Sequence, residues 1–242
     1  MKRSPPVSVR AWLEVPHRFV FARNHLALPA ARVLDVGCGN HSPSITKKYF
    51  PDSVYVGLDR EPWNVEELDY RMMDEYIHSD LESPDCLGAV PDGSFDVVIC
   101  SHVLEHIDDP LETASQLATK LKPSGLMYIE TPAKISAHLP RAATGWMGVR
   151  GCLNFRDDET HKALVDLSML RRRLETEGFR VSAIRRRFLW RRVLLLPGYV
   201  AAGLLMRGYI PASVLWDVTG FAQFVLVEGR STTPANTGSR YV

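Results

Sequence analysis

The fold of this chain is decided by one stretch, Val33-Leu34-Asp35-Val36-Gly37-Cys38-Gly39-Asn40. The mostly apolar residues from Arg32 to Val36 predict a buried strand. Two glycines follow at Gly37 and Gly39, where the chain must turn sharply and where a ligand can approach the backbone closely. A strand that ends in such a loop is typical of α/β folds that bind nucleotide-like cofactors.

Similar apolar runs bounded by turn residues recur along the chain. They predict further strands, which are Ser53 to Leu58, Tyr76 to His78, Phe95 to Cys100, Leu126 to Thr131, Arg180 to Ile184 and Phe221 to Val227. The run from Phe95 to Cys100 is continuously apolar after Phe95-Asp96 and belongs at the centre of the sheet. Helices are predicted to begin near Ser42 and to cover Pro110 to Leu121 and Leu164 to Glu177. This alternation predicts repeated β-α units on a mainly parallel sheet.

Two acidic residues end the strands that follow the first one. Asp59 stands at the end of the second strand, and Asp80 follows the third. A carboxylate at the end of the second strand can accept hydrogen bonds from ribose hydroxyls, and Asp80 can reach the adenine. Together with the glycine loop, these positions predict a site for a nucleotide-like cofactor.

Five blocks carry a resemblance to a known family, and they are Val33 to Asn40, Gly57-Leu58-Asp59, Ser79-Asp80-Leu81, Asp92 to Ile99 and His102 to Ile107. In order and spacing they resemble the class I S-adenosylmethionine-dependent methyltransferases. More narrowly, residues 30 to 190 look like the small-molecule branch that includes the ubiquinone-biosynthesis methyltransferases. The resemblance implies a Rossmann-like, doubly wound α/β fold with a mainly parallel seven-stranded sheet and an antiparallel last strand.

The resemblance also implies S-adenosylmethionine as the cofactor and gives roles to individual residues. By resemblance Gly37 and Gly39 flank the methionine part, Asp59 binds the ribose, and Asp80 with Leu81 meets the adenine. The complete cofactor-binding set is then Asp35, Gly37, Cys38, Gly39, Asp59, Arg60, Asp80, Leu81, Ser101 and His102. One departure concerns the loop, because Asn40-His41 stands where many relatives have a glycine.

Three histidines are candidates for a catalytic base. Methyl transfer needs positioning in a dry site, and a hydroxyl acceptor also needs a group that takes its proton. His102 and His106 follow the central strand, and His161 precedes the late helix, where relatives often show a histidine at the mouth of the site. His102 to His106 also spells H-x-x-E-H, but Asp108-Asp109-Pro110 leaves no room for the long helix of a zinc protease. We therefore predict no metal.

The predicted function is methyl transfer to a small-molecule, lipid or saccharide acceptor, with O-methylation favoured. The alternative is a noncatalytic S-adenosylmethionine-binding or scaffold protein. An NAD(P)-dependent oxidoreductase is disfavoured because Ser42 stands where the third glycine of G-x-G-x-x-G would be. Nucleic acid is disfavoured as an acceptor, since only an arginine cluster suggests an RNA methyltransferase. Cys100-Ser101-His102-Val103 replaces the motif of adenine and glutamine N-methyltransferases.

Composition and apolar runs divide the chain into parts. We predict an N-terminal extension at 1–30, a methyltransferase domain at 31–229 and a disordered tail at 230–242. The domain carries an irregular, substrate-side insertion at about 133–162 and an apolar C-terminal region at about 193–216. No apolar signal core follows the N-terminus, so a cytoplasmic location is expected. The sequence is silent on oligomeric state.

Charge is balanced over the whole chain but not along it. The net charge is +1, whereas residues 171–192 contain nine arginines and two glutamates. Solvated helix and strand faces account for most such runs. An anionic acceptor or an anionic membrane is the other interpretation, because apolar residues adjoin the arginines at Phe188, Trp190 and 194–196 and continue over Val200 to Met206. The same residues would otherwise close the core. A membrane-peripheral location is therefore kept open beside the cytoplasmic one.

Overall fold

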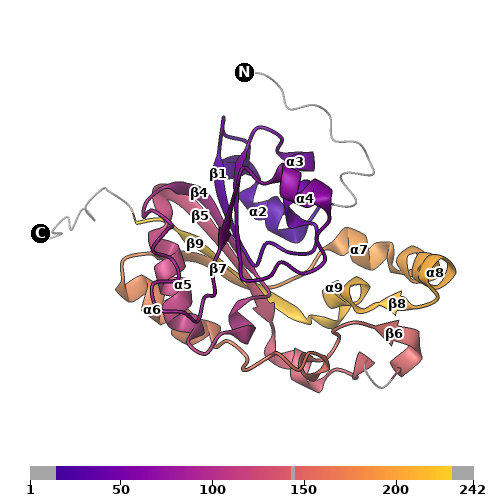
Figure 1. Cartoon of the computed structure of the whole chain (residues 1–242). Helices are drawn as coiled ribbons and strands as arrows, with labels where there is room; N and C mark the ends of the chain where they lie inside the picture. Colours follow the sequence, from indigo (N-terminus) through magenta and orange to yellow (C-terminus); the bar gives the residue numbers. More distant parts are fainter. Residues whose placement is uncertain (1–14, 143–144, 231–242) are drawn as a thin grey trace, which may run out of the picture.

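A seven-stranded sheet forms the centre of the protein, for which a computed structural model describes residues 15–142 and 145–230 (Figure 1). The strands lie in the order β3-β2-β1-β4-β5-β9-β7. Their bounds are β1 Arg32–Val36, β2 Val54–Asp59, β3 Glu75–His78, β4 Phe95–Ser101, β5 Leu121–Pro132, β7 Arg180–Arg186 and β9 Ala222–Glu228. β9 is antiparallel to both of its neighbours, and the remaining pairs are parallel. The predicted mainly parallel sheet with an antiparallel last strand is confirmed.

Helices cover both faces of this sheet, which explains why its central strands are apolar on both sides. Leu34 packs in a buried cluster with residues of α5 (Pro110–Thr119) and α6 (Leu167–Thr176). Its neighbour Val33 points to the opposite face and packs with Phe19 of α2 (His17–Leu26). This alternation follows the period of two along a strand. Two further helices, α3 Ser42–Tyr49 and α4 Glu67–Met72, belong to the N-terminal half of the chain.

Two helices differ in their bounds from the sequence prediction. α5 ends at Thr119 rather than at Leu121, because Leu121 already pairs with Phe95 at the start of β5. α6 begins at Leu167 rather than at Leu164, because the carboxylate of Asp166 accepts hydrogen bonds from the first amides of the helix. Such a cap fixes where a helix starts, whereas apolar spacing alone does not.

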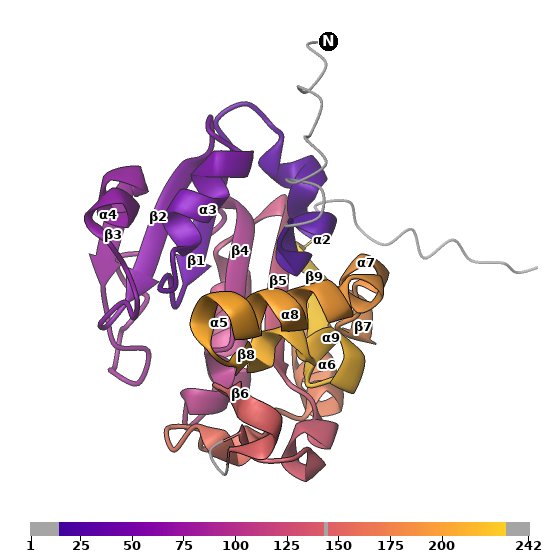
Figure 2. The same ribbon diagram turned by 90° about the vertical axis from the view of Figure 1, so that its right-hand side faces the viewer.

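A second group of elements lies between β7 and β9, outside the main sheet. It consists of α7 Trp190–Leu194, α8 Leu196–Arg207, β8 Ile210–Pro211, the 3-10 helix η6 Ala212–Val214 and α9 Trp216–Thr219. β8 pairs with β6 (Val149–Arg150), so this group is joined to the segment that follows β5. The helices α7, α8 and α9 lie together on the right-hand side of Figure 1, which is the side that faces the viewer in Figure 2.

The segment between β5 and α6 is built mostly from short 3-10 helices, as its weak periodicity predicts. These are η2 Lys134–His138, η4 Trp146–Gly148 and η5 Phe155–Asp157. No helix within residues 15–142 and 145–230 combines the length and the apolar character needed to cross a membrane. The predicted division at residues 30 and 229 stays a prediction, and the predicted tail beyond Arg230 lies outside the described residues, as does most of the N-terminal extension.

Candidate active site

The loop after β1 has room only for glycine at two positions. Gly37 has a φ of +70°, and a Cβ added there would overlap Cγ2 of Val103. A Cβ on Gly39 would lie 2.6 Å from the carbonyl oxygen of Trp63. Both contacts are far closer than non-bonded atoms tolerate, so a side chain at either position would displace its neighbour. The contact with Val103 also places the segment after β4 directly beside the loop.

Asp35 supports this loop from the protein interior. Its side chain is buried, and its Oδ2 accepts hydrogen bonds from the hydroxyls of Ser42 and Tyr55, the latter at 2.6 Å. Burial raises the pKa of Asp35 above its ordinary value. Cys38 is also fully buried, and burial raises the pKa of its thiol strongly. Both residues therefore support the loop from inside the protein, and their predicted contact with the cofactor stays a prediction.

The departure at Asn40-His41 has a structural basis. Both residues have a positive φ, 53° and 58°, which is the region that glycine normally occupies. Asn40 Oδ1 accepts a hydrogen bond of 2.9 Å from the side chain of Asn64, and His41 Nδ1 lies 2.8 Å from Oδ2 of Asp69. These side-chain bonds hold the strained turn in place of a glycine.

The two predicted carboxylates lie at the ends of adjacent strands. β2 ends at Asp59, whose Oδ1 accepts a hydrogen bond of 3.0 Å from the amide of Glu61. Asp80 follows β3, and Arg60 Nη1 donates to its Oδ2 at 3.2 Å. The amide of Glu82 and the Arg60 guanidinium lower the pKa of Asp80, so this carboxylate is charged at neutral pH. A loop that requires glycine at two positions, followed by two carboxylates, fits a ligand with a sugar and an amine-bearing base.

His102 stands between two carboxylates at the end of β4. Its Nδ1 lies 3.0 Å from Oε1 of Glu105, and its Nε2 lies 3.0 Å from Oε1 of Glu130. Ionised carboxylates only accept hydrogen bonds, so both ring nitrogens must carry protons. These two hydrogen bonds outweigh the effect of burial and raise the pKa of His102 to about 9. His102 is thus an imidazolium at neutral pH and is the least suited of the three histidines to accept a proton.

Glu130 is a site residue that the sequence analysis missed. It belongs to β5, is 3% exposed, and also accepts a hydrogen bond of 2.8 Å from Nη1 of Arg187. The Arg187 charge and the His102 hydrogen bond hold the pKa of Glu130 well below its ordinary value despite burial. The signal was present, because Glu130 is a lone acidic residue in the apolar run Leu126 to Thr131. A charge in a buried strand has to be paired.

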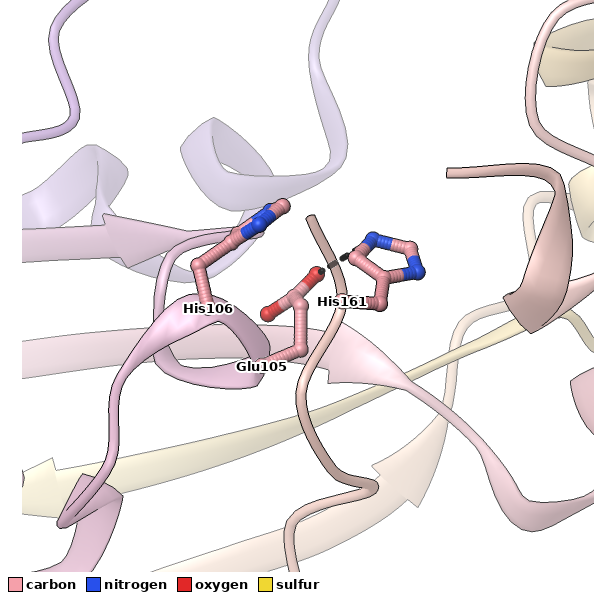
Figure 3. Close-up of side chains that lie close together, drawn as sticks. All are labelled: Glu105, His106 and His161. Atoms are coloured by element: carbon pink, nitrogen blue, oxygen red, sulfur yellow. Dashed lines mark ion pairs between the residues drawn. The ribbon is translucent and has the colours of Figure 1, made fainter. Parts of the chain in front are cut away.

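A second cluster joins the other two candidate histidines to Glu105 (Figure 3). Potential ligand atoms of Glu105, His106 and His161 all lie within 4.8 Å of one another. His161 Nε2 is 4.0 Å from Oε1 of Glu105, which is too long for a hydrogen bond. Oε2 of Glu105 is buried and has no hydrogen-bond partner among the described residues. The structure therefore brings both histidines to one buried carboxylate.

The hydrogen bonds of His106 and His161 determine which ring nitrogen carries the proton in each neutral imidazole. His161 Nδ1 lies 2.6 Å from the carbonyl oxygen of Phe155, so Nδ1 is the donor and Nε2 keeps its lone pair when the ring is neutral. The hydroxyl of Thr160 donates to Asp158 Oδ1 at 2.6 Å, so it accepts from His106 Nδ1 at 2.9 Å. Nε2 of both rings is then free to accept a proton. The same atoms with Glu105 are a donor set that divalent cations also use.

Aromatic side chains cover the His102 cluster from the C-terminal elements. The ring centroids of Trp216 and His102 are 4.9 Å apart, and Phe221 stacks on Trp216 at 4.7 Å. Trp216 Nε1 donates to the carbonyl oxygen of Cys152 at 2.8 Å, which ties the cover to the segment after β5. This contact could not be predicted from the sequence, because Trp216 and His102 are far apart in the chain.

The fold and the candidate site indicate a class of protein. Such a protein has a Rossmann-like fold, a candidate cofactor loop after β1 and proton-carrying side chains after β4. The family described as "Methyltransferase domain" matches residues 10–184, which is more than half of the chain. The chain belongs to this family of methyltransferases, and S-adenosylmethionine is the cofactor of the class. The resemblance stated from the sequence is confirmed at this level.

Individual relatives are similar to this chain over different shares of its length. The ubiquinone biosynthesis O-methyltransferase of Xanthomonas campestris pv. campestris (strain B100) is 33% identical over 132 residues, which cover 54% of this chain and 55% of that protein. The alignment thus spans about half the length of the curated relatives. A methyltransferase from Archaeoglobus fulgidus has a TM-score of 0.52 at 22% identity, covering 87% of this chain and 90% of its own. One from Mesorhizobium loti has a TM-score of 0.53 at 15% identity, with 89% and 99% covered. These two show the shared fold alone.

Proposed function

We propose that this protein transfers a methyl group to a hydroxyl oxygen of a small-molecule, lipid or saccharide acceptor. The observation that carries the proposal is the geometry of His161, whose Nδ1 donates to Phe155 and whose Nε2 faces the buried Glu105. A base held in one tautomer beside a carboxylate is suited to take a proton from a hydroxyl. The relatives named as O-methyltransferases support oxygen as the methylated atom.

The residues of the cofactor loop would hold S-adenosylmethionine, with Asp59 at the ribose and Asp80 at the adenine. When bound, this cofactor supplies an electrophilic methyl group on a sulfonium sulfur. The loop backbone at Gly37 adjoins Val103, so the methyl donor would lie beside the segment that carries Glu105, the carboxylate that His161 faces. Positioning of the two reactants in a closed site supplies much of the acceleration in such a reaction.

His161 takes the proton that the acceptor hydroxyl loses, at its Nε2. Glu105 lies 4.0 Å from this nitrogen and stabilises the imidazolium that forms. The His106 ring packs on His161 with centroids 4.8 Å apart, and Thr160 and Asp158 orient it. His102, already protonated, positions Glu105 and Glu130 rather than moving a proton. Trp216 and Phe221 keep water away from this side of the cluster.

A screen with tritiated S-adenosylmethionine against lipid, saccharide and small-molecule fractions tests the proposal. Label in an alkali-stable ether product supports O-methylation, and label on nitrogen or carbon contradicts it. The alternative of a noncatalytic S-adenosylmethionine-binding protein predicts cofactor affinity in calorimetry without label transfer to any fraction. With an acceptor in hand, His161→Ala is expected to lower turnover about 100-fold. If His161→Ala keeps full turnover and His106→Ala loses it, His106 is the base instead.

A further inference from the structure

The outer face of α8 is apolar and exposed, which is unusual for a helix on a protein surface. Helices on globular proteins turn an apolar stripe inward and polar residues outward. Here Leu205 is 87% exposed and Met206 is 84% exposed, and Leu194 just before the helix is 70% exposed. We call the exposed large side chains of this region the apolar ridge, and its members are Phe188, Trp190, Leu194, Leu195, Leu204, Leu205 and Met206.

The inward side of α8 already packs against the rest of the protein, so the apolar ridge is a separate, outward-facing surface of this helix. Val200 packs against a buried cluster, and Gly203 is buried against the backbone of Tyr209. From Leu196 to Met206 the helix carries no charged residue on either side. Figure 2 shows α8 lying along the outside of the molecule with its length exposed to the viewer. Its exposed face therefore carries no charge before Arg207.

Arginines flank this ridge along the chain, and the ridge itself contains no acidic residue. Between Gly178 and Trp216 the sequence has seven arginines and no aspartate, glutamate, lysine or histidine. Some of these arginines serve the protein interior, because Arg187 and Arg192 face Glu130 and Asp217. Others are exposed and have no ion pair with a described residue, and they are Arg185, Arg186 and Arg207, joined by Arg150 at the paired strand β6.

We infer that the apolar ridge docks on an anionic phospholipid bilayer, with α8 lying in the plane of the interface. Exposed leucines and methionine enter the acyl boundary, and the flanking arginines meet lipid phosphates. Charge complementarity selects this occupant. A second copy of the chain would bring the same arginines face to face, and a neutral surface would leave them without a partner. Twelve residues lie along an interface and do not span it.

The docking surface is connected to the candidate active site through buried contacts. Arg187 lies just before the ridge and donates to Glu130 beneath His102. α9 supplies Trp216, whose ring packs on His102. Docking therefore holds the acceptor side of the protein at the membrane. This consequence rests on the proposed function, whereas docking itself does not, and a binding assay separates the two.

Sedimentation with vesicles tests the inference on the full chain. Vesicles of phosphatidylcholine mixed with phosphatidylglycerol are expected to pull down the protein at low salt, at least about tenfold better than phosphatidylcholine alone. High salt should release it, because the charged contribution is screened. Equal binding to both vesicles, or binding to neither, would overturn the proposal.

Two pairs of variants assign the binding to this surface. Leu205→Asp/Met206→Asp and Arg185→Glu/Arg186→Glu are each expected to weaken binding at least about tenfold. The controls make the same kinds of change at exposed residues on other elements, Leu68→Asp/Met169→Asp and Arg23→Glu/Arg172→Glu, and should bind as the parent does. Thermal melting and S-adenosylmethionine binding verify that each variant is folded. Self-association that Leu205→Asp/Met206→Asp abolishes, without vesicle binding by the parent, would show that a second copy is the occupant.

Discussion

We propose a cofactor side and an acceptor side for this protein, and the two are built by different means. The cofactor side, at the ends of β1 to β3, is made from backbone shape: Gly37 and Gly39 leave no room for a Cβ. The acceptor side, after β4 and β5, is made from side chains that pair across the fold, as His102 does with Glu130. The conformation of a loop depends on residues that are adjacent in the sequence, whereas a hydrogen-bonded network depends on residues that are far apart in it.

The difference predicts where substitutions act. A change on the cofactor side alters ligand affinity and leaves the core intact, because the glycines line the surface of the loop. A change on the acceptor side disturbs a buried ionic network and lowers the stability of the whole domain. Four predictions test this contrast, beginning with the largest effect.

Loss of the Glu130 carboxylate should have the largest effect on stability. Glu130→Gln leaves the charges of His102 and Arg187 buried without their shared partner. Removing one member of such a buried group costs about 3 kcal/mol of unfolding free energy. Urea unfolding measures it, with Glu67→Gln as the control, because Glu67 pairs with Arg71 at the surface and should lose under about 1 kcal/mol. Equal effects of the two substitutions would contradict the contrast.

The acceptor side should also make stability depend on alkaline pH. The pKa of His102 is about 9 in the folded protein and near 6.5 in the unfolded chain. A raised pKa stabilises the fold fully below 6.5, and this stabilisation is lost as the pH rises through 9. Between pH 7 and pH 10 we expect a loss on the order of 2 kcal/mol. His102→Gln should flatten this part of the profile, and a variant that keeps the full slope would refute the assignment.

A substitution on the cofactor side should change affinity instead. Gly39→Ala places a methyl group against the backbone of Trp63, so the loop must shift. Calorimetry is expected to show about tenfold weaker binding of S-adenosylmethionine, which corresponds to about 1.4 kcal/mol. Gly198→Ala serves as the control, since nothing lies within 4 Å of a Cβ there. Unchanged affinity in Gly39→Ala would show that the loop does not hold the cofactor.

The smallest effect is expected from removal of metal ions. If Glu105, His106 and His161 act on protons, dialysis against a chelator should change turnover less than about twofold. The same residues can also ligate a divalent cation, so the experiment separates two uses of one cluster. Activity that a chelator abolishes and zinc or magnesium restores would assign the cluster to a metal and contradict the predicted absence of one.

The same contrast explains what could be predicted from the sequence. The strands and the cofactor loop were predictable because apolar runs and glycine turns are local signals. The two helix ends at Thr119 and Leu167 were missed, since pairing of Leu121 and capping by Asp166 decided them. Trp216 and Arg187 could not be placed beside His102 and Glu130, because only the folding of the C-terminal elements brings them there. The membrane-facing interpretation of the apolar region needed exposures that no sequence pattern provides.

The proposed division between cofactor binding and proton transfer is best tested by one paired measurement: S-adenosylmethionine affinity and turnover at saturating cofactor, for His161→Gln and for Gly39→Ala. We expect His161→Gln to keep its affinity within about twofold and to lose turnover about 100-fold. Gly39→Ala should lose affinity and keep turnover within about twofold once the cofactor is saturating. The two effects would then be fully separated between the two sides of the site. Full turnover in His161→Gln, or loss of cofactor binding in that variant, would contradict it.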